Sequence, residues 1–135
     1  MRGQKLYRTP TALHFAVVLS MSAVALAPRL PTVETAAIFS ALALFGLTNA
    51  VRACVGIAGP GPDRPAAHWS DFWTYGVAPA AIYVGLCAAS AAIGTGAEWA
   101  QYLVAAFLLA LLLLGIRNAW DLVTWIAPRS KGHAG

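Results

Sequence analysis

The sequence predicts an all-α, polytopic membrane protein in which four transmembrane helices form an up-down bundle. Of the 135 residues, 59% are hydrophobic and only 10% are charged, whereas soluble domains contain about 25% charged residues. Most of the molecular surface is therefore expected to face lipid. The clearest stretch is Glu98–Asp121, which is apolar between Trp99 and Ile116 apart from Gln101 and is long enough to cross a hydrocarbon layer of about 30 Å.

The first predicted span follows a short basic segment, residues 1–9, which we expect in the cytoplasm. Thr9 and Pro10 are a favourable helix start, because Thr caps an N-terminus and Pro at the first helical position loses no hydrogen bond. The basic start, the apolar centre and the run at residues 25–27 also fit a secretory signal peptide. We favour retention of this segment, because Pro28 would directly follow the cut and removal would leave three spans.

Prolines and turn residues separate the remaining spans. The predicted divisions are a transmembrane domain of residues 10–127, with spans at 11–27, 33–57, 71–93 and 97–126, and a cytoplasmic tail at 128–135. Ser70 is the expected N-cap of the third span, and Pro79 is expected to kink it. Thr95 and Glu98 fit a capping box, T-x-x-E, at the start of the fourth helix.

Orientation follows from the basic residues, eight of which flank the spans on one side. They are Arg2, Lys5 and Arg8 before the first span, Arg52 and Arg64 between the second and third, and Arg117, Arg129 and Lys131 after the fourth. Arg29 alone lies on the other side. The excess of Lys and Arg in cytoplasmic loops predicts a multi-pass protein of the inner (cytoplasmic) membrane with both termini in the cytoplasm.

An internal repeat appears when the chain is shifted by 69 residues. Pro10 then falls on Pro79, Gly46 on Gly115, Asn49 on Asn118 and Ala50 on Ala119. The shared pattern G-x-x-N-A predicts a duplicated helical hairpin, with both copies in the same orientation.

Small and polar residues of the repeat predict an interface between the second and fourth helices. The residues are Gly46, Asn49, Ala50, Gly115, Asn118 and Ala119. Small residues four apart let two helix backbones approach, and an adjacent Asn can bond across the contact. The alternatives are a solute or ion site lined by the two amides, or a contact between subunits.

Residues at the cytoplasmic boundary predict contact with anionic lipid headgroups or with a partner. They are Arg52, Arg117, Trp120 and Asp121. The plainer interpretation is that the long side chains extend to the interface and that Arg117 pairs with Asp121, four residues away on one helix face.

His14 is a weaker functional candidate, because an ionisable residue inside a span is functional by default. Tyr83, near mid-bilayer, is expected to face the bundle because its hydroxyl needs a partner. Cys54, His68 and Asp71 could gather as metal ligands only in principle, since no two potential ligands lie four apart on one helix. We expect no metal and no cofactor.

The sequence favours a non-enzymatic scaffold or accessory subunit with a basic, Trp-rich cytoplasmic face. Its expected partners are the lipid bilayer, anionic lipid headgroups and either further copies of itself or a larger membrane complex. Nucleic acid is not expected, because that would need a basic face outside the membrane. The alternative is a small oligomeric transporter or channel with polar groups at Asn49, Asn118 and His14. No span carries a central Asp or Glu, the usual carboxylate of proton-coupled transport.

Overall fold

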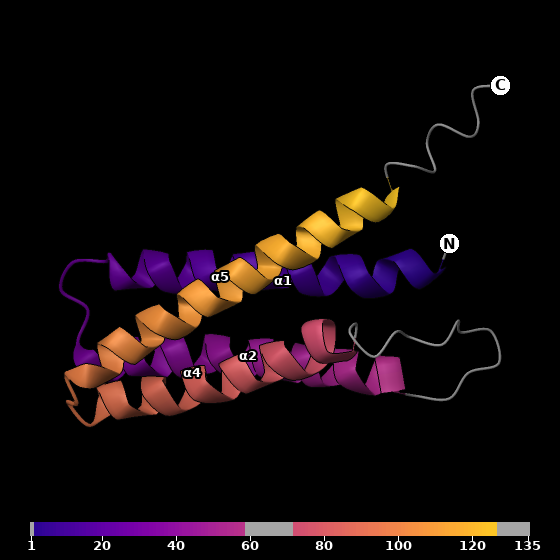
Figure 1. Cartoon of the computed structure of the whole chain (residues 1–135). Helices are drawn as coiled ribbons and strands as arrows, with labels where there is room; N and C mark the ends of the chain where they lie inside the picture. Colours follow the sequence, from indigo (N-terminus) through magenta and orange to yellow (C-terminus); the bar gives the residue numbers. More distant parts are fainter. Residues whose placement is uncertain (1, 59–71, 127–135) are drawn as a thin grey trace, which may run out of the picture.

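In the computed structural model, which describes residues 2–58 and 72–126, four α-helices form a bundle in which each helix is antiparallel to the next along the chain (Figure 1). The elements are α1 (Arg2–Ala25), α2 (Thr32–Ala58), the π-helical turn η1 (Trp73–Val77), α4 (Ala78–Gly94) and α5 (Trp99–Ile126). All secondary structure in the described residues is helical, which confirms the all-α class. The start of α1 and the end of α5 lie at the same end of the bundle (Figure 1).

Three helical segments are long and apolar enough to cross a membrane. They are Thr32–Ile57 in α2, Trp73–Gly94 in η1 and α4, and Trp99–Thr124 in α5. The apolar part of α1, Thr11–Ala25, is shorter. Large apolar side chains such as Leu44, Leu109 and Leu113 point outward and are more than half exposed, which suits a surface that faces lipid. These properties identify the chain as a helical membrane protein.

Helices α2 and α5 begin and end within about two residues of the second and fourth predicted spans, but the predicted start of the first helix is wrong. Helix α1 begins at Arg2 and passes through Thr9 and Pro10 without a break. A proline inside a helix removes one hydrogen bond, here the one to the carbonyl of Leu6. The turns on either side keep their own bonds, so the helix continues.

The predicted capping box at Thr95 and Glu98 is also wrong, because Thr95 ends α4 instead of opening α5. The Thr95 hydroxyl donates to the Ala92 carbonyl at 2.8 Å. The amides of Gly96 and Ala97 donate back to Ile93 and Ala92 at 2.9 and 3.2 Å, and Gly96 has a φ of +79°. This is the Schellman arrangement, in which a left-handed glycine closes the last turn of a helix.

The disturbance predicted at Pro79 takes the form of the π-helical turn η1. Pro79 stands in the first turn of α4 and has no amide hydrogen for the carbonyl of Tyr75. The amide of Ala78 bonds to the carbonyl of Trp73, five residues earlier. Ser70, the expected N-cap, lies outside the described residues.

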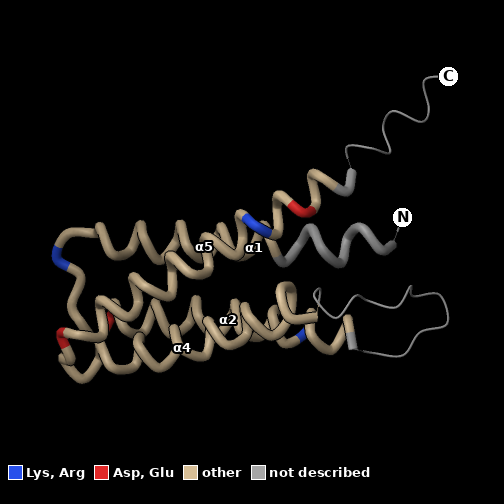
Figure 2. Tube along the Cα trace, in the orientation of Figure 1, with Lys and Arg blue, Asp and Glu red and all other residues tan. Residues whose placement is uncertain are grey.

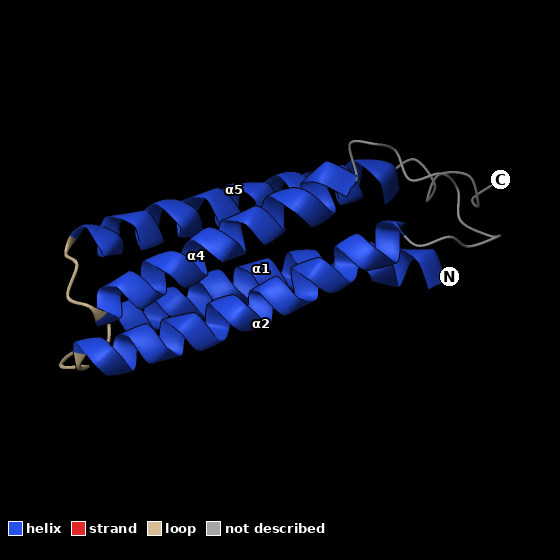
Figure 3. Cartoon of the chain, turned by 90° about the horizontal axis from the view of Figure 1, so that it is seen from below, coloured by secondary structure: helices blue, strands red, loops and turns tan. Residues whose placement is uncertain are grey.

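The four helices occupy the corners of a square when viewed down the bundle. Helix α1 packs against α2 and α5, and α4 packs against α2 and α5. The diagonal pairs are α1 with α4 and α2 with α5, as Figures 1 and 3 together show. The predicted pairing of the second helix with the fourth, α2 with α5, is therefore replaced by pairing of α2 with α4.

Small residues explain the close packing of α2 on α4. The buried face of α2 repeats at intervals of three and four residues and consists of Ala36, Phe39, Ala43, Gly46 and Ala50. A Cβ atom on Gly46 would overlap the ring of Tyr83, which is fully buried on α4. The missing side chain at Gly46 thus makes room for the tyrosine that fills the bundle centre.

Within residues 11–58 and 72–124, the charged side chains lie at the two ends of the bundle, with an uncharged stretch between them (Figure 2). At the end that holds the two short turns they are Arg29, Glu34 and Glu98, and at the other end they are Arg52, Arg117 and Asp121. Glu34 and Arg52 are 18 residues apart on α2, which is about 27 Å along the helix axis. That spacing matches a hydrocarbon core of about 30 Å.

Candidate functional site

A buried hydrogen bond links two diagonal helices at the centre of the bundle. His14 Nδ1 lies 3.0 Å from the hydroxyl of Tyr83, and the two side chains are 2% and 0% exposed. The prediction that Tyr83 faces the bundle is confirmed. His14 Nε2 has no hydrogen-bond partner among the described residues. The pair joins α1 to α4 in the buried interior of the bundle.

Asn118 ties α5 to the π-helical turn. Its Nδ2 donates to the carbonyl of Thr74, and the hydroxyl of Tyr75 donates to the Asn118 carbonyl, both at 3.3 Å. The side chain is 1% exposed. Asn118 was predicted to form a hydrogen bond across a helix contact, and it does so. Its partner, however, is η1 and not α2.

Asn49 lies in a different environment from Asn118, and the structure does not bring the two together. Its Nδ2 donates to the carbonyl of Phe45 in the same helix at 2.8 Å. Gly115 packs on α1, where an added Cβ would lie 3.4 Å from Phe15. The predicted interface is therefore divided. Gly46 and Ala50 face the seam between α2 and α4, Gly115 and Asn118 face α1 and η1, and Ala119 is half-buried.

The residues predicted to meet lipid headgroups or a partner are exposed at one end of the bundle. Arg52 lies near the end of α2, and Arg117 and Asp121 lie near the end of α5, which point the same way (Figure 1). Trp120 is 68% exposed. Within the described part of the chain no ion pair joins Arg117 to Asp121, so the predicted pairing is not formed. Both side chains stay available to bind outside groups.

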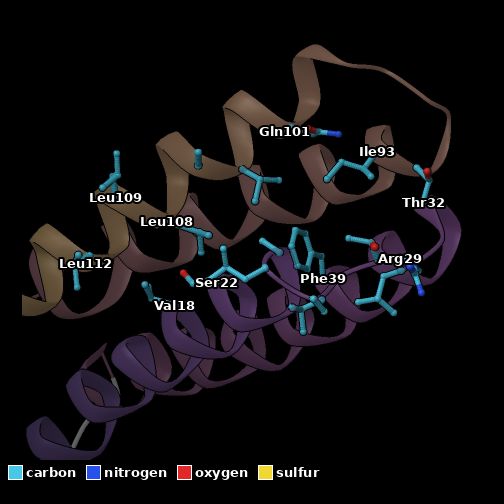
Figure 4. Close-up of a pocket in the computed structure, with 18 residues that line it drawn as sticks. Val18, Ser22, Arg29, Thr32, Phe39, Ile93, Gln101, Leu108, Leu109 and Leu112 are labelled. Carbon is cyan, nitrogen blue, oxygen red and sulfur yellow. The ribbon is translucent and has the colours of Figure 1, made fainter.

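A groove opens at the other end of the molecule, between the last turns of α1 and the first half of α5; we call it the α1–α5 groove (Figure 4). It encloses about 740 Å³. The buried side chains of Phe39, Ile93 and Val104 form its floor. Arg29 and Thr32 lie together at one end, whereas Val18 and Leu112 lie at the other (Figure 4).

The groove exists because α1 and α5 approach closely only at one level. Their contact at Phe15 and Gly115 lies toward the end of the bundle that carries the start of α1. From that contact to the short turn at residues 26–31 the two helices diverge, and Figure 1 shows α5 inclined across α1. The groove is thus a wedge, open at the turn and closed near the middle of the bundle.

No protein-family model matches the sequence, and no significant similarity to a curated protein or a solved structure was found. The placement of the chain among helical membrane proteins rests on its helices alone.

Sequence reasoning did not find the groove. Arg29 was distinctive as the one basic residue on its side, and Gln101 as the one polar residue of its span. Both line the groove. Arg29 and Gln101 line the same groove because of the angle between α1 and α5. This angle cannot be predicted from a local sequence pattern. His68 and Asp71, which could act as metal ligands only in principle, lie outside the described residues.

Proposed function

We propose that the chain is a four-span protein of the inner (cytoplasmic) membrane, built from a duplicated hairpin, that serves as a non-enzymatic scaffold or accessory subunit. Its binding surface is the exposed end formed by Arg52, Arg117, Trp120 and Asp121, here called the basic end. Both termini lie on that side, in the cytoplasm.

The fourth span in this proposal is α1. Its apolar part, Thr11–Ala25, packs beside α2 and α5. Its last turn leads through residues 26–31 into α2, at the same end of the bundle as the turn between α4 and α5 (Figure 1). A helix that starts and stops level with three spanning neighbours has the geometry of a span itself.

The arrangement of the central pair supports the duplication. His14 and Tyr83 are separated by 69 residues, which equals the shift that aligns the two halves of the sequence. They meet across the diagonal between α1 and α4, the first helices of the two hairpins. Equivalent residues meet in this way when two copies are related by a two-fold axis through the bundle centre.

The proposed binding role is supported by exposed side chains at the basic end. Trp120 is 68% exposed, and Ile116 and Val123 are 51% and 58% exposed. They neighbour Arg117, which forms no ion pair with any residue that the structure describes. Arg and Trp are the residues that dominate binding energy at protein interfaces. The bundle centre, by contrast, is filled by Tyr83, Met21, Leu86 and Leu111, each 0% exposed. A filled centre favours a scaffold over a transporter.

Site-specific photocrosslinking in membranes tests this role. A photoreactive residue in place of Trp120 should form an adduct with one partner protein, and Arg117→Gln should weaken that adduct. The control places the same residue at Trp99, which is 60% exposed at the other end of α5 and should not give the adduct. Crosslinks to its own copies alone, or the same partner from both positions, would contradict the proposal.

A further inference from the structure

We propose that the α1–α5 groove is a binding site for one anionic phospholipid, with an acyl chain in the groove and the phosphate on Arg29. This goes beyond the scaffold role, since the groove lies at the opposite end of the molecule from the basic end.

The depth of the groove matches one leaflet of a bilayer. On α5 its lining runs from Gln101 to Leu112, eleven residues and therefore about 16 Å along the axis. Half of a hydrocarbon core of about 30 Å is close to that value. The rim is open to the side, where Leu26 and Leu109 are 83% and 61% exposed, so a lipid can enter from the bilayer.

The lining of the groove is polar at one end and mostly apolar at the other. A phospholipid likewise has a polar headgroup at one end and apolar acyl chains at the other. Arg29, Thr32 and Gln101 supply polar groups at the turn, and beyond them the lining is apolar apart from Ser22 and Thr35. The polar end lies where a headgroup would be, and the apolar end reaches toward the bilayer centre. An acyl chain alone would not require the polar end.

Arg29 is suited to hold a phosphate. Among the described residues its guanidinium forms no ion pair, although Glu34 and Glu98 lie at the same end of the bundle. A guanidinium binds phosphate oxygens through two parallel hydrogen bonds. Arg29 also adopts a φ of 67°, a conformation that L residues other than Asn and Asp rarely take. A residue kept in a strained conformation at the mouth of a groove points to a role for its side chain.

The shape of the groove favours a lipid over a helix of a partner protein. The wedge closes where Phe15 meets Gly115, so it spans only one leaflet. A helix crossing the membrane is about 10 Å wide and would need a groove through both leaflets. An acyl chain ends at the bilayer centre and needs no further room.

Native mass spectrometry of the full-length protein tests the site, with phosphatidylglycerol as the anionic probe and phosphatidylcholine as the zwitterionic one. We expect one phosphatidylglycerol to be retained and phosphatidylcholine to be retained less. Ala105→Phe fills the groove and should abolish retention. Its control is Ala106→Phe, since Ala106 is also exposed on α5 but does not line the groove, and it should retain the lipid.

A second pair of variants tests the phosphate contact. Arg29→Asn keeps a residue that tolerates positive φ but removes the charge. Loss of a charged hydrogen bond should weaken retention of phosphatidylglycerol about tenfold, and Arg29→Lys should restore part of it. Arg52→Gln, at the basic end, should have no effect.

Two results would overturn the site: retention that neither Ala105→Phe nor Arg29→Asn reduces, and equal retention of the two lipids. Circular dichroism and gel filtration of each variant establish that it is folded. Crosslinking from Trp120 is scored separately, so failure of the lipid site and failure of the scaffold role remain distinguishable.

Discussion

Single side chains decide how the centre of this bundle is filled. Tyr83 occupies the middle, and it can do so because Gly46 on α2 has no side chain and because His14 on α1 accepts or donates a hydrogen bond at its hydroxyl. In an apolar interior an unpaired polar atom is costly. The fold therefore depends at this point on one small residue and on one polar pair.

Tyr83→Phe tests the polar pair. The variant keeps the ring and removes the hydroxyl, which leaves His14 Nδ1 without its partner. We expect the free energy of unfolding in mixed micelles to fall by about 0.5–2 kcal/mol. Tyr102→Phe is the control, because Tyr102 is 78% exposed and its change should stay within about 0.5 kcal/mol. Equal effects at the two positions would show that the central hydrogen bond is not formed.

Gly46→Ala tests the space beneath Tyr83. Its new methyl group would overlap the buried ring, and overpacking of this kind costs about 1–3 kcal/mol. The same substitution at Gly56 places its methyl group in open space, and the better helix propensity of Ala should leave stability unchanged or raise it by up to about 1 kcal/mol. Detergent-induced unfolding compares the two variants. A Gly46→Ala variant as stable as Gly56→Ala would contradict the described packing.

At the scale of elements, the two halves of the molecule pack differently although their sequences repeat. Shifting by 69 residues places Phe39 of α2 on Leu108 of α5 and Ala43 on Leu112. The smaller Ala43 lets α4 lie close along α2. The larger Leu112 keeps α1 from lying equally close along α5. The groove lies in the wider space between these two helices.

The limits of the second and fourth helices could be predicted from sequence to within about two residues, because they depend on neighbouring residues. A short stretch of sequence is enough to show an unbroken apolar run that ends at Arg117 and Asp121, or a turn that contains Gly96. The choice of packing partners could not be predicted, because it depends on the whole arrangement. Asn49 and Asn118 match in the repeat, yet one bonds within its own helix and the other reaches η1. The groove could not be predicted either, because it depends on how α1 and α5 pack.

Replacement of each asparagine by alanine separates these two environments. Asn118→Ala removes the donor to the Thr74 carbonyl and opens a small space in a buried contact, so we expect a loss of about 1–3 kcal/mol of unfolding free energy. Asn49→Ala removes only a bond to its own helix and should change stability by less than about 0.5 kcal/mol. Thermal unfolding in detergent measures both. Equal losses would instead favour the symmetrical contact expected from the repeat.

At the scale of the whole molecule, charge defines the two ends of the protein. Within residues 11–58 and 72–124, six charged side chains form two groups, three at each end, and about 27 Å of uncharged helix lies between Glu34 and Arg52. The surface proposed to bind a partner and the groove proposed to bind a lipid lie at opposite ends. Under these two proposals, a partner would bind on one side of the membrane and a lipid would bind in the leaflet on the other.

The proposed topology requires α1 to cross the membrane along with the three longer spans, so that both ends of the chain share one compartment. The test measures the cleavage of short peptide tags by an impermeant protease, in spheroplasts and in lysed spheroplasts, because an outer membrane would exclude the protease from intact cells. Tags are placed at the amino end, in the turn at residues 26–31 and at the carboxyl end. We expect only the tag in the turn to be cleaved in spheroplasts, and all three tags to be cleaved after lysis. Cleavage of the amino-terminal tag together with the turn tag, while the carboxyl-terminal tag stays protected, would show that α1 does not cross and would contradict the account.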